Sequence, residues 1–201
     1  MTSTRSLARA SSRRTASDWG LFVREFIKHP AMVASIVPSS GRVIRRMLDR
    51  VDWANTKVFV EYGPGVGTFC QAVLDRLGPD AEYIAIDPNP EFVEHLRHKF
   101  RDSRFVLVQG SAEDVRQILK DRGHDHADYI LSGLPFTTLP AGVGDTIARE
   151  TAEALRPGGA FLVYQFRPKV RSFFEPYLPK IDSALEWWNV PPAQLWWAWK
   201  E

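Results

Sequence analysis

The sequence predicts an α/β fold: a mostly parallel, doubly wound sheet of seven strands that ends in an antiparallel hairpin. The main observation is that short apolar runs alternate with segments of helical periodicity. The apolar runs are residues 58–60, 83–86, 105–108, 127–131 and 160–166. The second observation is the tail, where residues 184–190 and 195–199 flank a Pro-Pro turn, as in a hairpin. Ligands of such sheets bind beyond the carboxyl ends of the strands, where we expect the functional site.

The first apolar run leads into a glycine cluster, Gly63, Gly65 and Gly67, followed by a segment of helical spacing. Glycines let the backbone turn tightly and approach a ligand without an intervening Cβ. A plain tight turn is the structural alternative. The spacing also differs from the dinucleotide fingerprint, whose third glycine would fall at position 68, which is Thr.

Two acids accompany these glycines. Glu61 closes the first strand, and Asp87 closes the second run, directly before Pro88. An acid in the position of Asp87 can accept hydrogen bonds from both hydroxyls of a ribose.

The stretch Glu61-Tyr62-Gly63-Pro64-Gly65-Val66-Gly67 with Asp87 resembles the Rossmann-like, class I S-adenosylmethionine-dependent methyltransferases. The resemblance implies S-adenosyl-L-methionine as cofactor and S-adenosyl-L-homocysteine as product. It implies cofactor contacts from Glu61, Gly63, Gly65, Gly67, Asp87, Pro88 and Ser132. An NAD-type fold and a cofactor-free α/β domain are the alternatives.

Two further turns are candidate cofactor contacts. Ser39 and Ser40 precede a helix over residues 42–50, which they can cap, or they can face the cofactor carboxylate. Ser111, Ala112 and Glu113 follow the third strand, where Ser111 can cap the next helix; the methyltransferase resemblance implies that this turn edges the adenine.

Length and composition indicate a globular protein of ordinary make-up. The chain has 201 residues, 44% hydrophobic and 25% charged, and its single cysteine, Cys70, excludes an internal disulfide. We expect Cys70 to be a small buried residue. We divide the chain into a basic disordered arm (1–17), N-terminal helices (18–50) and a methyltransferase domain (51–201).

Basic charge is concentrated at the N-terminus. Residues 1–17 contain four arginines and no acid, whereas the remainder has 22 basic and 24 acidic side chains. The arm can be a transit peptide or a disordered tail. The body lacks the basic excess of a polyanion-binding protein, so we expect no nucleic acid partner. No run of about 18 apolar residues occurs, so any membrane role is peripheral.

The segment 18–29 is predicted to be an amphipathic helix. Its apolar side chains recur at helical spacing and end before Pro30; they are Trp19, Phe22, Val23, Phe26 and Ile27. This stripe can pack on the core of the protein, which the pattern alone favours, or lie in a membrane interface, which the neighbouring arginines favour.

The loop after the fourth strand, Gly133-Leu134-Pro135-Phe136, is the expected acceptor site. The rRNA adenine N6-dimethyltransferases carry Asn-Leu/Ile/Val-Pro-Tyr/Phe there, and this chain has Gly133 in place of the Asn.

Residues 19–166 more closely resemble the bacterial phospholipid N-methyltransferases. The shared motifs are Phe26-Ile27-Lys28-His29-Pro30, Val37-Pro38-Ser39-Ser40, Ser132-Gly133-Leu134-Pro135 and the Pro157-Gly158-Gly159 turn before a strand bearing Tyr164. This resemblance implies stepwise methylation of phosphatidylethanolamine to phosphatidylcholine by a cytoplasmic enzyme at the inner leaflet, with anionic lipid as partner. An RNA-base methyltransferase and a non-enzymatic membrane module are the alternatives.

Methylating a primary amine requires removal of a proton, and Tyr164 and His29 are the candidate catalytic residues. The aromatic faces of Tyr62, Phe136 and Tyr164 can stabilise the cationic product. No metal is expected: Gly123-His124-Asp125-His126 has no partner ligands and is interpreted as a polar loop. The tail tryptophans can cover the sheet, the favoured interpretation, or form an interfacial patch.

Overall fold

The computed structural model describes residues 41–165, 168–189 and 192–201, which belong to one compact unit, residues 38–201. Several predictions lie outside the described residues: the arm, the helix at 18–29 with its five apolar residues, His29, Ser39 and Ser40.

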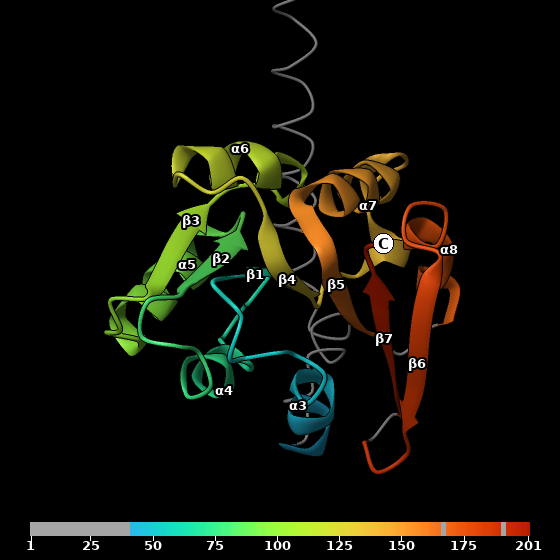
Figure 1. Cartoon of the computed structure of the whole chain (residues 1–201), viewed down its shortest axis with the longest axis horizontal. Coiled ribbons are helices and arrows are strands. Elements are labelled where there is room, and N and C mark those ends of the chain that lie inside the picture. The colour runs from blue at the N-terminus through green and yellow to red at the C-terminus, as the bar shows by residue number, and fades with distance from the viewer. Residues whose placement is uncertain (1–40, 166–167, 190–191) are drawn as a thin grey trace, which may run out of the picture. The chain divides into compact units, whose positions relative to one another are not determined.

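Seven strands form one sheet in the order β3-β2-β1-β4-β5-β7-β6 (Figure 1). They are β1 Val58–Tyr62, β2 Glu82–Asp87, β3 Phe105–Gln109, β4 Ala127–Ser132, β5 Leu155–Gln165, β6 Lys180–Glu186 and β7 Ala193–Trp199. The first five strands are parallel, and β7 is antiparallel to both β5 and β6. The predicted mostly parallel sheet with a C-terminal antiparallel hairpin is confirmed.

Helices cover both faces of this sheet. They are α3 Gly41–Leu48, α4 Cys70–Leu74, α5 Pro90–Lys99, α6 Val115–Asp121, α7 Val143–Ala154 and α8 Arg171–Phe174, with short 3-10 turns η2 Ala112–Asp114, η3 Phe136–Thr138 and η4 Pro168–Val170. Buried side chains of α6, α7 and α8 pack on one face, and those of α3, α4 and α5 pack on the other. Because α3 packs into the second core, it belongs with the sheet, whereas the sequence grouping placed it with the N-terminal helices.

Strand β5 begins earlier than the sequence indicates. The Pro157-Gly158-Gly159 segment, predicted to be a turn before the strand, lies within β5, and Leu155 begins the strand instead of ending the helix. The pairing shifts from Ala127 opposite Leu155 to Tyr129 opposite Ala160, which is a bulge. Gly158 has φ +76°, and a Cβ on Gly159 would meet the Asp128 carbonyl oxygen at 2.5 Å, so the bulge requires these glycines.

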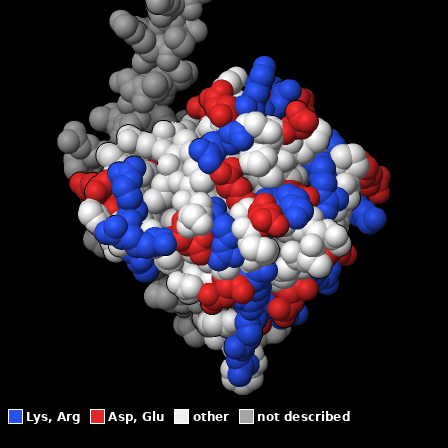
Figure 2. Space-filling model, turned by 60° about the vertical axis from the view of Figure 1, so that its left-hand side comes forward, with Lys and Arg blue, Asp and Glu red and all other residues white. Residues whose placement is uncertain are grey.

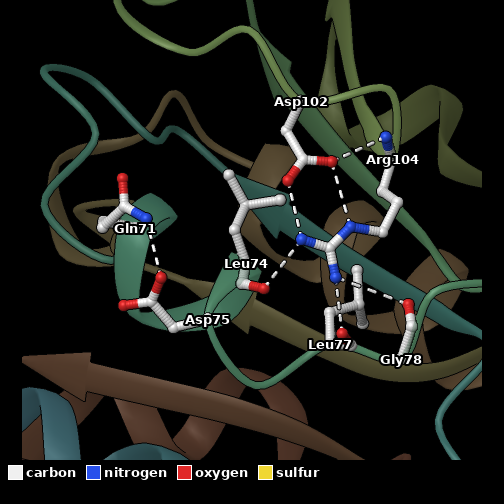
Figure 3. A network of polar contacts seen from close by, with 7 residues as sticks. All are labelled: Gln71, Leu74, Asp75, Leu77, Gly78, Asp102 and Arg104. Carbon is white, nitrogen blue, oxygen red and sulfur yellow. Dashed lines mark hydrogen bonds and ion pairs between the residues drawn. The ribbon is translucent and has the colours of Figure 1, made fainter.

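Helix α4, which follows the glycine cluster, is shorter than the apolar spacing predicts and ends at Leu74. Arg104, directly before β3, binds the carbonyl oxygens at this end: its guanidinium donates to Leu74 at 3.0 Å and to Leu77 at 2.5 Å (Figure 3). Asp102 holds the same guanidinium at 2.6 and 3.0 Å. The arginine thereby satisfies carbonyls that a helix end leaves without partners and ties α4 to the third strand.

Four of the five tail tryptophans divide into two pairs. Trp196 and Trp197, in β7, are buried in the two cores, which confirms for them the prediction that they cover the sheet. Trp187 and Trp188, between β6 and β7, are 71% and 77% exposed, so for them that prediction is wrong. The pairs differ because β7 lies between β5 and β6, whereas the turn projects beyond the sheet.

Candidate active site

The carboxyl ends of β1, β2 and β4 bring the predicted motifs to one edge of the sheet. Backbone hydrogen bonds join them: Gly63 N–H donates to the Ile86 carbonyl at 2.9 Å, and Gly133 N–H donates to the Tyr62 carbonyl at 3.5 Å. The glycine cluster therefore lies between Asp87 on one side and the acceptor loop on the other.

The three glycines of the cluster all have positive φ, and each occupies a different environment. A Cβ on Gly63 would meet the Leu134 side chain at 2.9 Å, and one on Gly67 would meet Leu96 and Phe100 of the α5 region at 2.7 and 2.8 Å. A Cβ on Gly65 would meet nothing within 4 Å. Two glycines thus permit close packing, and the third leaves open space against the backbone, as a cofactor cradle requires.

Asp87 is buried and accepts two backbone hydrogen bonds, from Gly65 N–H at 3.2 Å and from Asn89 N–H at 2.9 Å. Its burial raises its pKa from 3.8 to about 6, against the opposing effect of the two amides. The carboxylate is therefore fixed to the glycine cluster with lone pairs left for further donors, which suits a ribose diol.

Asn89 adds a polar group that the sequence analysis did not select. Its side-chain oxygen caps α5 by accepting from Glu91 N–H at 2.9 Å, which fixes the orientation of the amide. Its Nδ2 is buried and has no acceptor among the described residues. A buried donor without a partner is costly, so a ligand oxygen at this position would stabilise it. The residues of this edge therefore fit an adenosyl cofactor.

Glu61 lies beneath the cluster, on the α4 side of the sheet. Its buried carboxyl accepts a hydrogen bond from the Tyr83 hydroxyl and lies 3.9 Å from the Cys70 sulfur. Burial raises its pKa from 4.5 to about 7. Cys70 is buried, as predicted, and burial raises the pKa of its thiol. A cofactor contact from Glu61 stays a prediction, since the carboxyl bonds to these protein groups.

The turn after β3 is a helix cap, one of its two predicted roles. The Ser111 hydroxyl accepts from Glu113 N–H at 3.2 Å and starts η2. Burial raises the pKa of Glu113. The predicted adenine contact by Ser111, Ala112 and Glu113 is compatible with this cap and stays a prediction, as does the contact by Pro88.

The acceptor loop is held from two sides. Ser132 is buried, and its hydroxyl accepts from Leu134 N–H at 3.2 Å; Gln165 at the end of β5 donates to the Leu134 carbonyl at 2.5 Å. Gly133 faces Tyr164: a Cβ there would overlap the Tyr164 hydroxyl and meet its Cζ at 2.8 Å. The phenol therefore occupies the space into which a side chain at position 133 would project.

Tyr164 is half-buried and packs against Phe69, with 4.9 Å between ring centroids and the rings tilted by 38°. Burial raises the pKa of its hydroxyl, and the charge of Glu61 adds to this shift. The Tyr164 hydroxyl is thus a neutral hydrogen-bonding group that senses the charge of the Glu61 carboxyl, whose pKa is about 7.

Three other candidates lie elsewhere. Phe136 is buried against Phe161 and Phe173, and Tyr62 is buried with its hydroxyl 3.0 Å from Thr151, so both rings belong to the core. Their contact with an acceptor, and that of Leu134 and Pro135, stays a prediction. His124 pairs with Glu82 at 2.7 Å, and among the described residues no group of three or more metal-ligating side chains is clustered.

Sequence reasoning missed Asn89, Lys99 and Gln165. Lys99 donates to the Val66 carbonyl of the glycine cluster at 2.9 Å. The Asn-Pro pair shortly after Asp87 was a local signal for Asn89. Lys99 and Gln165 are distant in sequence from the groups they contact, so no local pattern indicated them.

The chain is similar to several known proteins. A family model described as "Methyltransferase domain" matches residues 59–159. An ornithine lipid N-methyltransferase from Singulisphaera acidiphila is 33% identical over 178 residues, 88% of this chain and 93% of that protein. A probable ribosomal RNA small subunit methyltransferase A from Thermococcus onnurineus is 29% identical over 47% of this chain and 31% of its own length.

Solved structures share the fold. An O-methyltransferase family protein from Burkholderia thailandensis matches with TM-score 0.63 and 14% identity, over 81% of this chain and 56% of its own. A 16S rRNA N2 methyltransferase from T. thermophilus, in complex with AdoMet and guanosine, matches with TM-score 0.58 and 17% identity, over 79% of this chain and 42% of its own. The chain thus spans less than two thirds of either protein.

Proposed function

Because the chain belongs to the class I S-adenosylmethionine-dependent methyltransferases, we propose that it methylates the amino group of a membrane lipid, with phosphatidylethanolamine as acceptor. Its cofactor is S-adenosylmethionine, which when bound supplies an electrophilic methyl group on a sulfonium. The proposed reaction proceeds stepwise through the mono- and dimethyl forms to phosphatidylcholine.

The observation that carries the proposal is the acceptor loop. The adenine dimethyltransferases have a similar loop, in which an Asn at the position of Gly133 binds a planar amino group. Here Gly133 has no side chain, and the Tyr164 hydroxyl occupies that space. The hydroxyl and the aromatic ring of Tyr164 suit a tetrahedral amine that becomes a cation on methylation. The hydroxyl can bind the amine, and the ring face attracts the positive charge of the product.

The amine must lose a proton before it can attack. An amine with a pKa of ~10.4 requires roughly 4–5 kcal/mol to be deprotonated at pH 7. In the proposed mechanism the Tyr164 hydroxyl accepts a hydrogen bond from the amine and orients its lone pair. The proton passes to water as the amine enters the site, and the fraction of Glu61 that is ionised, given its pKa of about 7, favours this loss. The remaining task is alignment of donor and acceptor without water.

A second candidate acceptor is an ornithine lipid, favoured by the relative that is 33% identical over 88% of this chain. Both acceptors present an amine on a membrane-anchored molecule, so the loop geometry serves either. An RNA-base acceptor is less supported: the loop lacks the Asn, and the face seen in Figure 2 carries acidic and basic side chains interspersed, without an extended basic tract.

We further propose that the protein works at the cytoplasmic surface of an anionic membrane, with the predicted helix at 18–29 as one contact. A lipid acceptor supports this location, because its amine is presented only at the bilayer surface. Within the described residues, no helix is long and apolar enough to cross a membrane.

The test is transfer of label from S-adenosylmethionine to vesicles of phosphatidylethanolamine, to vesicles of ornithine lipid and, separately, to total RNA. We expect label in the lipid fraction. Tyr164→Phe should lower the lipid rate about 10- to 100-fold with little change in cofactor affinity. Tyr177→Phe, which removes the hydroxyl of an exposed tyrosine, is the matched control and should leave the rate unchanged. Label only in RNA, or an unchanged rate for Tyr164→Phe, would contradict the proposal.

A further inference from the structure

The tip of the β6–β7 hairpin exposes two neighbouring tryptophans. Trp187 is 71% and Trp188 is 77% exposed, whereas Trp196 and Trp197 in the adjoining strand are buried. Indole is the largest apolar side chain, and adjacent exposed copies form the kind of patch that marks an interaction surface.

The strand register places this tip at the edge of the sheet that holds the candidate active site. Gln165, at the carboxyl end of β5, pairs with Gln194 near the start of β7, and Glu186 pairs with Ala193. The turn between β6 and β7 therefore lies beyond the carboxyl end of β5, the same edge to which β1, β2 and β4 bring the glycine cluster, Asp87 and the acceptor loop.

The tip is attached to helix α3 by a buried acid. Glu186 is 6% exposed; its carboxylate accepts from Trp188 N–H at 3.2 Å and pairs with Arg46 at 3.3 Å. Arg46 also donates to the Leu185 carbonyl at 3.0 Å. Figure 1 shows α3 near the lower end of the hairpin. These contacts hold the tryptophan turn against the helix.

Helix α3 supplies positive charge to the same surface. Its sequence contains Arg42, Arg45 and Arg46 and no acid. The Arg42 guanidinium lies 5.5 Å from the Trp188 ring centroid. Both Arg42 and Arg45 are exposed, and in the described part of the chain neither has an acidic partner, while Arg46 is paired with Glu186. The two indoles, the Arg42 guanidinium beside Trp188 and the exposed Arg45 one turn further along α3 make up what we call the tryptophan–arginine surface (Trp187, Trp188, Arg42 and Arg45).

We propose that the tryptophan–arginine surface is a membrane-contact site that inserts its indoles among the headgroups of an anionic bilayer. Indole is favoured at the membrane–water interface, and arginines there are attracted by anionic lipid. The surface lies at the same edge of the sheet as the acceptor loop, so docking through it would bring that edge to the lipid headgroups. The inference rests on the proposed lipid acceptor and assigns the contact to residues outside the predicted helix at 18–29.

The experiment is co-sedimentation of the full chain with vesicles of phosphatidylcholine alone and of phosphatidylcholine with phosphatidylglycerol. Trp187→Ala/Trp188→Ala should weaken binding to the anionic vesicles at least about 10-fold. Arg42→Ala/Arg45→Ala should weaken binding to anionic vesicles only and reduce its salt dependence. Arg149→Ala is the control, because this exposed arginine lies in the middle of α7, which packs on the face of the sheet opposite to α3. Binding that is equal for all variants would overturn the proposal.

A second measurement uses the indoles as depth probes. Brominated phospholipids should quench part of the wild-type tryptophan fluorescence. Trp187→Phe/Trp188→Phe, which retains apolar rings, should bind within about threefold of wild type but lose most of that quenching. If quenching is unchanged in this variant, the indoles lie outside the bilayer and the proposal is contradicted. Binding of the hairpin tip to a protein partner, without binding to vesicles, would also contradict it.

Activity separates this proposal from the proposed function. Lipid dispersed in detergent micelles does not require docking to a bilayer, so Trp187→Ala/Trp188→Ala should keep its methylation rate there. If wild type methylates lipid in micelles and the variants bind vesicles normally, the surface assignment fails and the function stands. If wild type binds vesicles through this surface but methylates no lipid, the function fails.

Discussion

The cofactor side and the acceptor side of the candidate site are built in different ways. The cofactor side consists of backbone around Gly63, Gly65 and Gly67, fixed by the carboxylate of Asp87. The acceptor side is a loop without its own polar side chain at Gly133, shaped by Tyr164 from a strand 31 residues further along. Backbone recognition depends on local glycine spacing, whereas the acceptor pocket depends on which distant side chain fills the space. The cofactor side thus depends on keeping its glycines and its acid, and the acceptor side is where a new substrate can be accommodated.

The largest expected effect comes from the packing glycines of the cofactor side. Gly67→Ala adds a Cβ that overlaps Leu96 and Phe100 at a φ of +80°, so we expect a loss of about 3–5 kcal/mol in the free energy of unfolding. Gly65→Ala has a positive φ but open space, so it should lose only about 1 kcal/mol. Urea denaturation measures both.

The same pair separates folding from binding. Gly65→Ala should weaken S-adenosylmethionine binding about 10-fold or more in calorimetry, because its new methyl group enters the cradle. Equal stability losses in the two variants, or normal cofactor binding by Gly65→Ala, would mean that the three glycines do not have the separate roles assigned to them.

On the acceptor side, Gly133→Ala should displace the Tyr164 ring and lower lipid methylation roughly 100-fold, since small misplacements of reacting groups have effects of this order. Cofactor affinity should change by less than about threefold, because the cradle is built separately. The rate is measured with labelled cofactor and the affinity by calorimetry.

The double variant Gly133→Ala/Tyr164→Phe is the control for steric overlap. It removes the hydroxyl that the new Cβ meets but leaves the contact with the ring carbon Cζ, so it should recover part of the stability lost in Gly133→Ala without recovering the rate. Loss of cofactor binding in Gly133→Ala would show that the two sides are not independent.

A smaller effect should appear in the pH dependence of stability. The folded-state pKa of Glu61, about 7, exceeds its usual value of 4.5, so the native state retains a proton that the unfolded state releases. The free energy of unfolding should therefore fall as pH rises from about 4.5 to about 7 and then level off. Asp87, with a pKa of about 6, contributes a similar fall at lower pH.

Glu61→Gln removes the first contribution. Between pH 6 and pH 8 the variant should lose about 1 kcal/mol less stability than wild type, measured by urea denaturation without cofactor. Parallel curves for the two proteins would contradict the assignment of a raised pKa to Glu61.

Much of the fold could be predicted because it rests on short-range pattern. Each of the five parallel strands overlaps one of the five apolar runs, because strands in the middle of a parallel sheet are covered on both faces and are mostly apolar. The bulge in β5 was missed because it depends on how Gly159 meets the Asp128 carbonyl of a neighbouring strand. The exposure of Trp187 and Trp188 was missed because composition does not distinguish a turn beyond the sheet from a strand within it.

The sequence by itself determined the parallel sheet, the glycine cluster and the acid at its edge, because strand periodicity and turn chemistry act over a few neighbouring residues. Only the tertiary structure decided that Tyr164 fills the space at Gly133, that Asn89 has a buried donor without an acceptor among the described residues, and that Arg42 lies beside Trp188. These pairings join residues far apart in the chain, and the packing of whole strands and helices sets them.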